Sequence, residues 1–147
     1  FIQRVLDLLK EGGRAVIVLP QGIFNNSNEK YVRRYITSQA RILAVVGLHG
    51  NSFKPHTGTK TSLLFLRKYR QDETPADYPI FFAVSKLPFK DNSGEYIFVK
   101  DKNGELVYDE QGDPLYQTDL HMIAEAFKNF AMQELAQGDT AFKFVKG

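Results

Sequence analysis

The sequence predicts an α/β fold, in which helices cover a small sheet, and three segments support this. Residues 14–19 and 41–48 are short apolar runs without alternation, as expected for parallel strands covered on both faces. Between them, residues 29–39 carry apolar side chains at helical spacing. Strand, helix and strand in this order form the βαβ unit of an α/β sheet, with a right-handed crossover.

A third apolar run, residues 61–68, follows the second after a loop of about a dozen residues that shows no helical pattern. Parallel neighbours need a long crossover, usually a helix, whereas antiparallel neighbours need only a loop. We therefore expect this third strand to run antiparallel to the second.

The remaining elements of the first half are shorter. Residues 1–10 have helical spacing, with neither an initiating Met nor an N-cap residue before them, so we expect the chain to be part of a longer protein. Gly12 and Gly13 end that helix, and Pro20 ends the first strand.

The second half is less regular. Residues 78–85 are strand-like, and residues 96–99 and 106–108 predict a hairpin around an Asn-Gly turn. Thr118 or Asp119 is a candidate cap for a helix that runs to about Leu135. Residues 109–113 superficially resemble a calcium loop, but their spacing favours an acidic turn.

Composition indicates one packed domain. A chain of 147 residues with 43% hydrophobic and 24% charged residues is well outside the disordered range. No apolar run approaches the roughly 18 residues that a membrane span needs, so we expect no membrane partner. The absence of Cys excludes disulfides, thiolate metal sites and Cys nucleophiles, and it fits a reducing, cytoplasmic setting.

Charge is divided unevenly along the chain. Residues 25–70 contain nine Lys and Arg against one acidic residue, whereas residues 71–139 contain five Lys against fourteen Asp and Glu. This pattern is compatible with one face that meets a polyanion, and equally with two ordinary solvated faces.

A polar, basic loop at residues 51–61 lies between the second and third predicted strands. It combines one aromatic residue, Phe53, with two lysines, several hydroxyls and a glycine. Loops at strand ends are where α/β sheets bind ligands, and this set of side chains suits a nucleic-acid base and its phosphates. Alternatively, Phe53 merely caps the edge of the sheet.

Several segments are informative together: GGRAVIVLPQGIF at 12–24, YVRRY at 31–35, RILAVVGL at 41–48, and FK at 53–54 before TKTSLLFL at 59–66. This combination resembles the modification subunit of type I restriction-modification systems, an adenine-specific (N6) DNA methyltransferase. The resemblance covers about residues 1–70 closely, and residues 109–130 are similar to a later region of the family. It implies part of a class I, Rossmann-like methyltransferase sheet, which ends in an antiparallel strand.

The resemblance also implies roles for particular residues. Phe53 occupies the place of the aromatic that stacks on the target adenine after this base has been flipped out of the duplex. The nearby polar side chains are candidates for contacts with DNA phosphates: Lys54, Thr57, Thr59, Lys60 and Thr61. A second group follows the first strand and is a candidate rim of the cleft: Gln21, Gly22, Asn25 and Asn26. Asn25 and Asn26 also suit an ordinary polar loop with a helix cap.

The chain departs from the family pattern in three ways. It has no glycine-rich turn for S-adenosylmethionine, no acidic residue placed for the ribose, and no Asn or Asp followed by Pro-Pro and an aromatic residue. Residues 1–70 are therefore expected to be the second half of the catalytic domain, with residues 71–147 as a family-specific extension. We expect no catalytic, cofactor-binding or metal residue in this fragment, and no activity from it alone.

The expected partners follow from the resemblance. They are double-stranded DNA, S-adenosylmethionine bound elsewhere in the protein, and the specificity, restriction and second modification subunits of the complex. His49 and His56 are weak candidates for metal or acid–base chemistry, because no ligand-type residues stand at suitable spacing. A non-catalytic module for nucleic-acid binding or for assembly is the alternative function.

Overall fold

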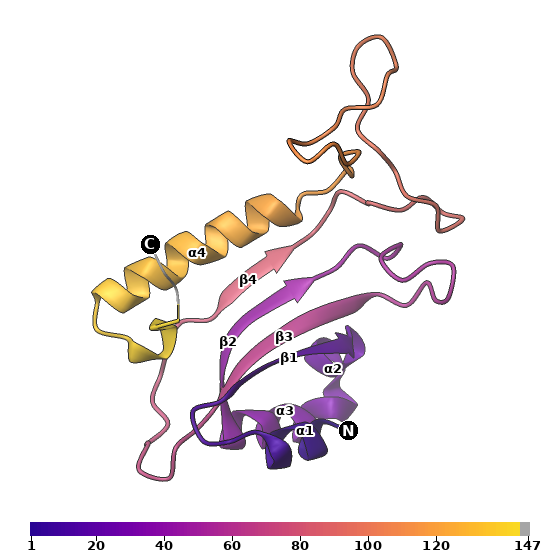
Figure 1. Ribbon diagram of the computed structural model, residues 1–147. Helices are drawn as coiled ribbons and strands as arrows, with labels where there is room; N and C mark the ends of the chain where they lie inside the picture. Colours follow the sequence, from indigo (N-terminus) through magenta and orange to yellow (C-terminus); the bar gives the residue numbers. More distant parts are fainter. Residues whose placement is uncertain (145–147) are drawn as a thin grey trace.

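The computed structural model describes residues 1–144 and contains one four-stranded sheet in the order β1-β3-β2-β4 (Figure 1). The strands are β1 Arg14–Pro20, β2 Ala40–Gly47, β3 Thr61–Lys68 and β4 Phe81–Val84. Helices cover both faces of the sheet, so the predicted α/β class is confirmed.

Strand β3 runs antiparallel to both of its neighbours, β1 and β2. The prediction that the third strand reverses direction is therefore confirmed. Since β1 and β2 both oppose β3, they point the same way, and α3 makes the crossover between them. Strand β4 lies within the strand-like segment 78–85 and joins the far side of β2 in parallel.

Four short elements pack on one face of the sheet. They are α1 Ile2–Leu8, α2 Gly22–Asn25, the 3-10 turn η1 Ser27–Glu29 and α3 Lys30–Gln39. The core on this face contains Leu6 of α1 and Ile36 of α3 against Leu64 and Leu66 of β3, all at most 3% exposed. Burying such side chains stabilises the fold by roughly 1.5–3 kcal/mol each.

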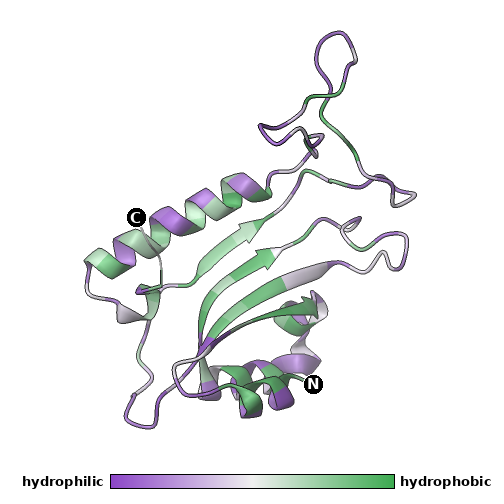
Figure 2. Ribbon diagram, in the orientation of Figure 1, coloured by the Kyte–Doolittle hydropathy of each residue, from purple (hydrophilic) through white to green (hydrophobic). Residues whose placement is uncertain are grey.

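The opposite face is covered by α4 Leu120–Ala136 and the 3-10 turn η2 Thr140–Phe142. Its core is aromatic: Phe142 is fully buried and meets the ring of Phe130 edge-on at 5.6 Å between centroids. Phe127 of the same helix packs at 6.2 Å on Phe65 of β3. Figure 2 shows the apolar sheet between the two sets of helices.

Helix α4 lies beside β4 (Figure 1) and packs on β4 and β3 through Phe127, while part of β1 stays uncovered on that side. Val16 and Val18 of β1 are 56% and 46% exposed, while the alternate residues Ile17 and Leu19 are buried on the other face. Strand β1 also forms one edge of the sheet. Its outer edge and one of its faces are thus open.

Residues 85–119 leave the sheet after β4 and form three successive turns (Figure 1). The predicted hairpin of residues 96–99 and 106–108 is present around its turn, where Lys100 and Leu106 form an antiparallel bridge, but it does not extend into a regular ladder. The arms instead close a ring of three bonds, in which Val107 donates to Val99 at 3.0 Å, Leu115 to Val107 at 2.8 Å and Val99 to Leu115 at 2.8 Å. Each of the three short arms forms a backbone hydrogen bond with each of the other two, so no pair of arms builds a continuous ladder.

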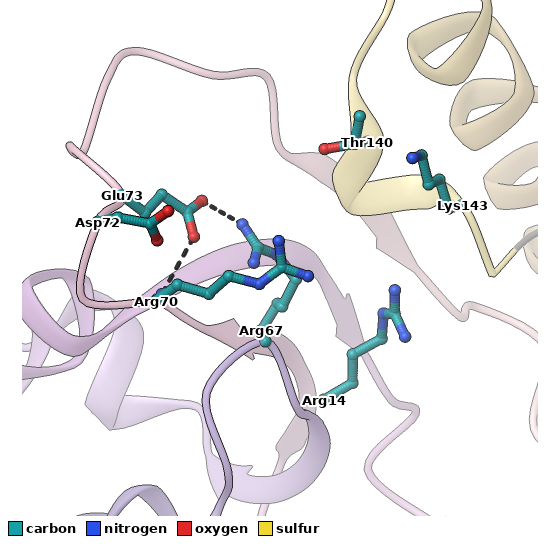
Figure 3. Close-up of a pocket in the computed structure, with 8 residues that line it drawn as sticks. Arg14, Arg67, Arg70, Asp72, Glu73, Thr140 and Lys143 are labelled. Atoms are coloured by element: carbon teal, nitrogen blue, oxygen red, sulfur yellow. Dashed lines mark hydrogen bonds and ion pairs between the residues drawn. The ribbon is translucent and has the colours of Figure 1, made fainter.

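A row of three arginines crosses the sheet at the end away from the β2–β3 loop. Arg14, Arg67 and Arg41 are register partners on β1, β3 and β2. Arg41 forms an ion pair with Asp139 and Arg67 one with Glu73, whereas Arg14 stacks over the Phe144 ring at 4.3 Å. Figure 3 shows Arg14, Arg67 and Arg70 around a hollow of about 330 Å³ that Asp72 and Glu73 also line.

The ion pairs tie the segment after α4 and the segment after β3 to the sheet. Burial raises the pKa of Asp139, but the hydrogen bonds and charge of Arg41 outweigh it and hold that pKa below its ordinary value. The pKa of Glu73 is likewise lowered, because Arg67 outweighs the effect of burial. No helix among residues 1–144 is long and apolar enough to cross a membrane.

These pKa directions set a pH dependence of folding. Groups with a depressed folded pKa contribute stability that is complete above the unfolded pKa, about 4, and is lost as the pH falls through the folded pKa. We expect Asp139→Asn to lower the free energy of unfolding at pH 7 by about 2 kcal/mol, between the values for exposed and for fully buried pairs. The variant should also lose less stability than the wild type between pH 5 and pH 2. Denaturant unfolding at several pH values measures both the loss at pH 7 and the pH dependence. If the free energy of unfolding fell with pH as steeply in the variant as in the wild type, the role given to the Arg41–Asp139 ion pair would be contradicted.

Candidate functional site

A cleft of about 500 Å³ opens where β1, β2 and β4 end and β3 begins. The carboxyl ends of parallel strands are the usual place for ligands in open α/β sheets. The cleft is lined by backbone and side chains of Gln21, Gly47, Leu48, His49, Gly50, Asn51, Lys60, Thr61, Val84, Ser85 and Lys86.

Backbone hydrogen bonds continue past the strands and hold this end together. Gln21 N–H donates to the Lys60 carbonyl at 3.0 Å, and Leu48 N–H donates to the Thr61 carbonyl at 2.9 Å. Ser85 N–H donates to the Gly47 carbonyl at 2.8 Å. The walls of the cleft are therefore extensions of the sheet.

The loop between β2 and β3 forms one side of the cleft and folds on its own backbone. Lys54 N–H donates to the Asn51 carbonyl at 3.1 Å, and Thr57 N–H donates to the Phe53 carbonyl at 3.1 Å. The ring nitrogen Nδ1 of His49 accepts from Asn51 N–H at 3.1 Å. Phe53 stands in this structured loop with 38% of its surface exposed.

Asp119 fixes the opposite side of the cleft, beyond β4. Its carboxylate accepts from the Ser85 hydroxyl at 2.6 Å and from the N–H groups of Lys86 and Leu87 at 2.7 and 3.1 Å. Burial raises the pKa of Asp119, but these hydrogen bonds outweigh it and lower the pKa overall. Of the two predicted cap candidates, Thr118 supplies the side-chain bond, because its hydroxyl accepts from Leu120 N–H, whereas Asp119 stands at the N-cap without a side-chain cap bond.

The structure brings only some of the predicted site residues together. Gln21, Lys60 and Thr61 line the cleft. Phe53, Lys54, Thr57 and Thr59 lie on the adjoining loop, where the Thr57 hydroxyl accepts from Thr59 N–H at 3.1 Å.

The other predicted rim residues belong to the α2–η1 segment. Gly22 and Asn25 lie in α2, and Asn26 is the N-cap of η1. The Asn26 side-chain oxygen accepts from Asn28 N–H at 3.2 Å, and the Asn26 backbone carbonyl accepts from the Arg33 guanidinium at 2.7 Å. These contacts place Asn26 in the support of a turn.

Three polar residues that line the cleft were given no role by the sequence reasoning, although one of them, Asn51, lies in the loop at 51–61 that it singled out. Ser85 ends the strand-like run at 78–85 and Lys86 follows it directly. The strand-end rule would therefore have found both residues if this strand had been assigned to the sheet. Asn51 lines the cleft as well, and its role depends on contacts with residues about forty positions away.

The chemistry available at the cleft follows from its lining, which offers two lysines, two side-chain amides and one histidine but no carboxylate. Its two hydroxyls are not available to a ligand, because that of Ser85 donates to Asp119 and that of Thr61 is buried. Such a lining can donate hydrogen bonds to phosphate oxygens and bind the polar edge of a base, and it offers no acidic ligand for a cation. Within residues 1–144, no group of three or more His, Asp or Glu side chains is placed to hold a metal ion.

The chain is similar to known proteins over most of its length. The model of the N-6 DNA Methylase family matches residues 1–145. The methylase subunit of the type I restriction enzyme EcoEI from Escherichia coli is 33% identical over 69 residues, which cover 46% of this chain and 14% of that protein. The MpnII methylase subunit from Mycoplasma pneumoniae is 31% identical over 104 residues, covering 70% of this chain and 17% of that protein.

A solved structure of a type I R-M system, described in terms of complex assembly and conformational transition, also matches. It shares 20% identity with a TM-score of 0.47, and the match covers 87% of this chain and 22% of that one. The chain thus spans about one sixth of the length of the curated relatives that it matches.

The Asp119 contacts generate a prediction about this end of the sheet. Asp119→Ala removes hydrogen bonds to a charged acceptor, so we expect the free energy of unfolding to fall by about 2 kcal/mol. Asp113→Ala is the matched control, since no hydrogen bond to the Asp113 side chain is found among the described residues. Chemical denaturation measures both variants, and equal stability of the two would contradict the role of Asp119.

Proposed function

Because the chain belongs to the N-6 DNA methylase family, we propose that it forms the target-base and DNA side of the active site of an S-adenosylmethionine-dependent adenine-N6 DNA methyltransferase. We further propose that the whole protein is the modification subunit of a type I restriction-modification system. The two methylase subunits at 33% and 31% identity support this choice of system.

One observation carries the proposal: a partly exposed aromatic ring, Phe53, on an ordered loop beside a basic cleft at the carboxyl end of the sheet. An adenine flipped out of a duplex loses its stacking partners at a cost of a few kcal/mol and needs a replacement face. Stacking on an aromatic side chain supplies roughly 1–3 kcal/mol per base. Phe53 would supply that face.

The cleft residues would act on the DNA backbone. Lys60 is exposed at the cleft edge, and Lys86 stands across from it after β4. Ammonium groups at these positions suit phosphates on either side of a flipped nucleotide, which they would position without reading sequence. Thr57, Thr59 and Gln21 would add neutral hydrogen-bonding groups. Thr61 is not among them, because its hydroxyl oxygen is buried and cannot reach a phosphate.

The residues that line this cleft do not fit the methyl donor. No carboxylate lines the cleft to bind ribose hydroxyls, and Gly22 opens a four-residue helix instead of belonging to a glycine-rich turn. We place S-adenosylmethionine and the Asn or Asp-Pro-Pro-aromatic motif in another part of the protein. The open edge of β1 and its exposed Val16 and Val18 are a suitable place for the sheet to continue towards that part.

The role of this chain is therefore positioning. Methyl transfer to N6 needs the nitrogen lone pair aligned with the donor methyl, and a base held in one orientation meets that need. In this proposal the fragment alone is inactive, the protein is cytoplasmic, and the acidic second half faces the other subunits of the complex.

The first functional prediction concerns Phe53. In the methyltransferase that carries this chain, Phe53→Ala should lower kcat/KM for adenine methylation by roughly 5- to 150-fold, which corresponds to the loss of 1–3 kcal/mol of stacking. Phe53→Tyr keeps the ring and should stay within a few-fold of the wild type. Transfer of labelled methyl groups to a DNA duplex measures both variants, and an unimpaired Phe53→Ala enzyme would refute the stacking role.

The second functional prediction concerns Lys60. If its ammonium neutralises one phosphate, Lys60→Gln should flatten the slope of log K against log salt concentration by about 0.9. Lys10→Gln, at an exposed position just after α1, is the matched control and should keep the wild-type slope. Fluorescence anisotropy of labelled duplex at several salt concentrations gives the slopes, and identical slopes for all three proteins would exclude this contact.

A further inference from the structure

The same five-residue turn occurs three times in the segment after β4, at residues 91–95, 101–105 and 109–113. Each copy begins with Asp, has Gly at its fourth position and ends with Glu or Asp. In each, the Asp carboxylate accepts from the N–H groups two and four residues later, at 2.8–3.1 Å. The three glycines have φ of +98°, +85° and +87°, so the copies share one backbone conformation.

The copies differ in what surrounds them. A Cβ added at Gly94 would lie 2.5 Å from the backbone nitrogen of Pro55 and 2.8 Å from the carbonyl carbon of Lys54. A Cβ added at Gly104 or Gly112 would meet no described atom within 4 Å. The first turn is thus seated on the backbone of the β2–β3 loop directly after Phe53.

Side chains on both sides of this contact fasten the two segments together. The Asn51 amide donates to the Lys90 carbonyl at 3.1 Å and to the Asn92 side-chain oxygen at 3.2 Å. The Lys54 ammonium donates to the Asn92 carbonyl at 3.0 Å, and the Lys90 ammonium donates to the Lys54 carbonyl at 3.0 Å. Asn51 and Lys54 flank Phe53 in the sequence, so the loop is held on both sides of the ring.

We propose that the 91–95 turn is a positioning element that holds the Phe53 loop in the conformation required for stacking on the target base. Phe53 is partly exposed and cannot fix its own orientation by burial, so its direction depends on this support. The inference rests on the proposed function of Phe53. It also assigns the Lys54 ammonium to support of the loop, which leaves Lys60 and Lys86 as the phosphate ligands.

The repeat supplies its own control for the test. Gly94→Ala and Gly104→Ala impose the same positive-φ strain in the same turn, but only Gly94→Ala pushes against the Phe53 loop. In the full-length protein we expect Gly94→Ala to accelerate amide hydrogen exchange of residues 49–60 roughly fivefold or more. This is the change expected when the loop loses about 1 kcal/mol of hydrogen bonding that opposes its local opening. Gly104→Ala should leave exchange in these residues unchanged.

A second pair covers the case in which Gly94→Ala does not fold. Asn51→Ala removes the two amide bonds to residues 90 and 92. Asn103→Ala is the control, because its side chain in the second turn makes no hydrogen bond to the loop among the described residues. Exchange in residues 49–60 should rise in Asn51→Ala and not in Asn103→Ala.

The functional readout separates positioning from simple destabilisation. In a duplex with 2-aminopurine at the target position, the loosened variants should show stronger emission from an unstacked flipped base. In the adenine duplex, kcat for methylation should fall more than KM for DNA rises. Equal exchange in Gly94→Ala and Gly104→Ala would overturn the inference and leave the proposed function standing. If Gly94→Ala loosens the loop but Phe53→Ala leaves the enzyme fully active, both the inference and the proposed stacking role of Phe53 are overturned.

Discussion

The reversed direction of β3 is the constraint on which the site depends. Leu64 and Leu66 of β3 are fully buried between β1 and β2, so this central strand cannot shift without opening the core. Because β3 follows β2 in the chain and runs antiparallel to it, the chain has to turn back at the carboxyl end of β2. The loop that makes this turn carries Phe53, and the sheet thereby places an aromatic ring beside the polar cleft.

The second half of the chain stabilises both ends of that sheet. At one end, Asp139 and Glu73 neutralise two of the three arginines that lie side by side on β2, β3 and β1. At the other end, Asp119 fixes the exit of β4, and the 91–95 turn fixes the loop after β2. Some of the acidic residues after position 70 thus pair with basic residues earlier in the same chain. Composition alone cannot tell such pairs from a charged surface that binds other molecules.

Local patterns predicted the elements of the first half and the reversal of β3, because apolar runs and a helix-free loop are sequence-local signals. They did not predict that the strand at 81–84 pairs with β2, since that pairing depends on tertiary contacts across the intervening loop. At the site, the pattern singled out the Phe53 loop but not its support. The repeated Asp and Gly of the three turns are visible in the sequence, whereas the seating of Gly94 against Pro55 is visible only in three dimensions.

The central claim is that Phe53 contacts the flipped base. Photocrosslinking tests it most directly, with 5-iodouracil in place of the target adenine and the enzyme that carries this chain. The account predicts that the crosslinked peptide contains Phe53 and that the crosslink is lost in Phe53→Ala. A crosslink to a different segment, or one that persists in Phe53→Ala, would contradict it.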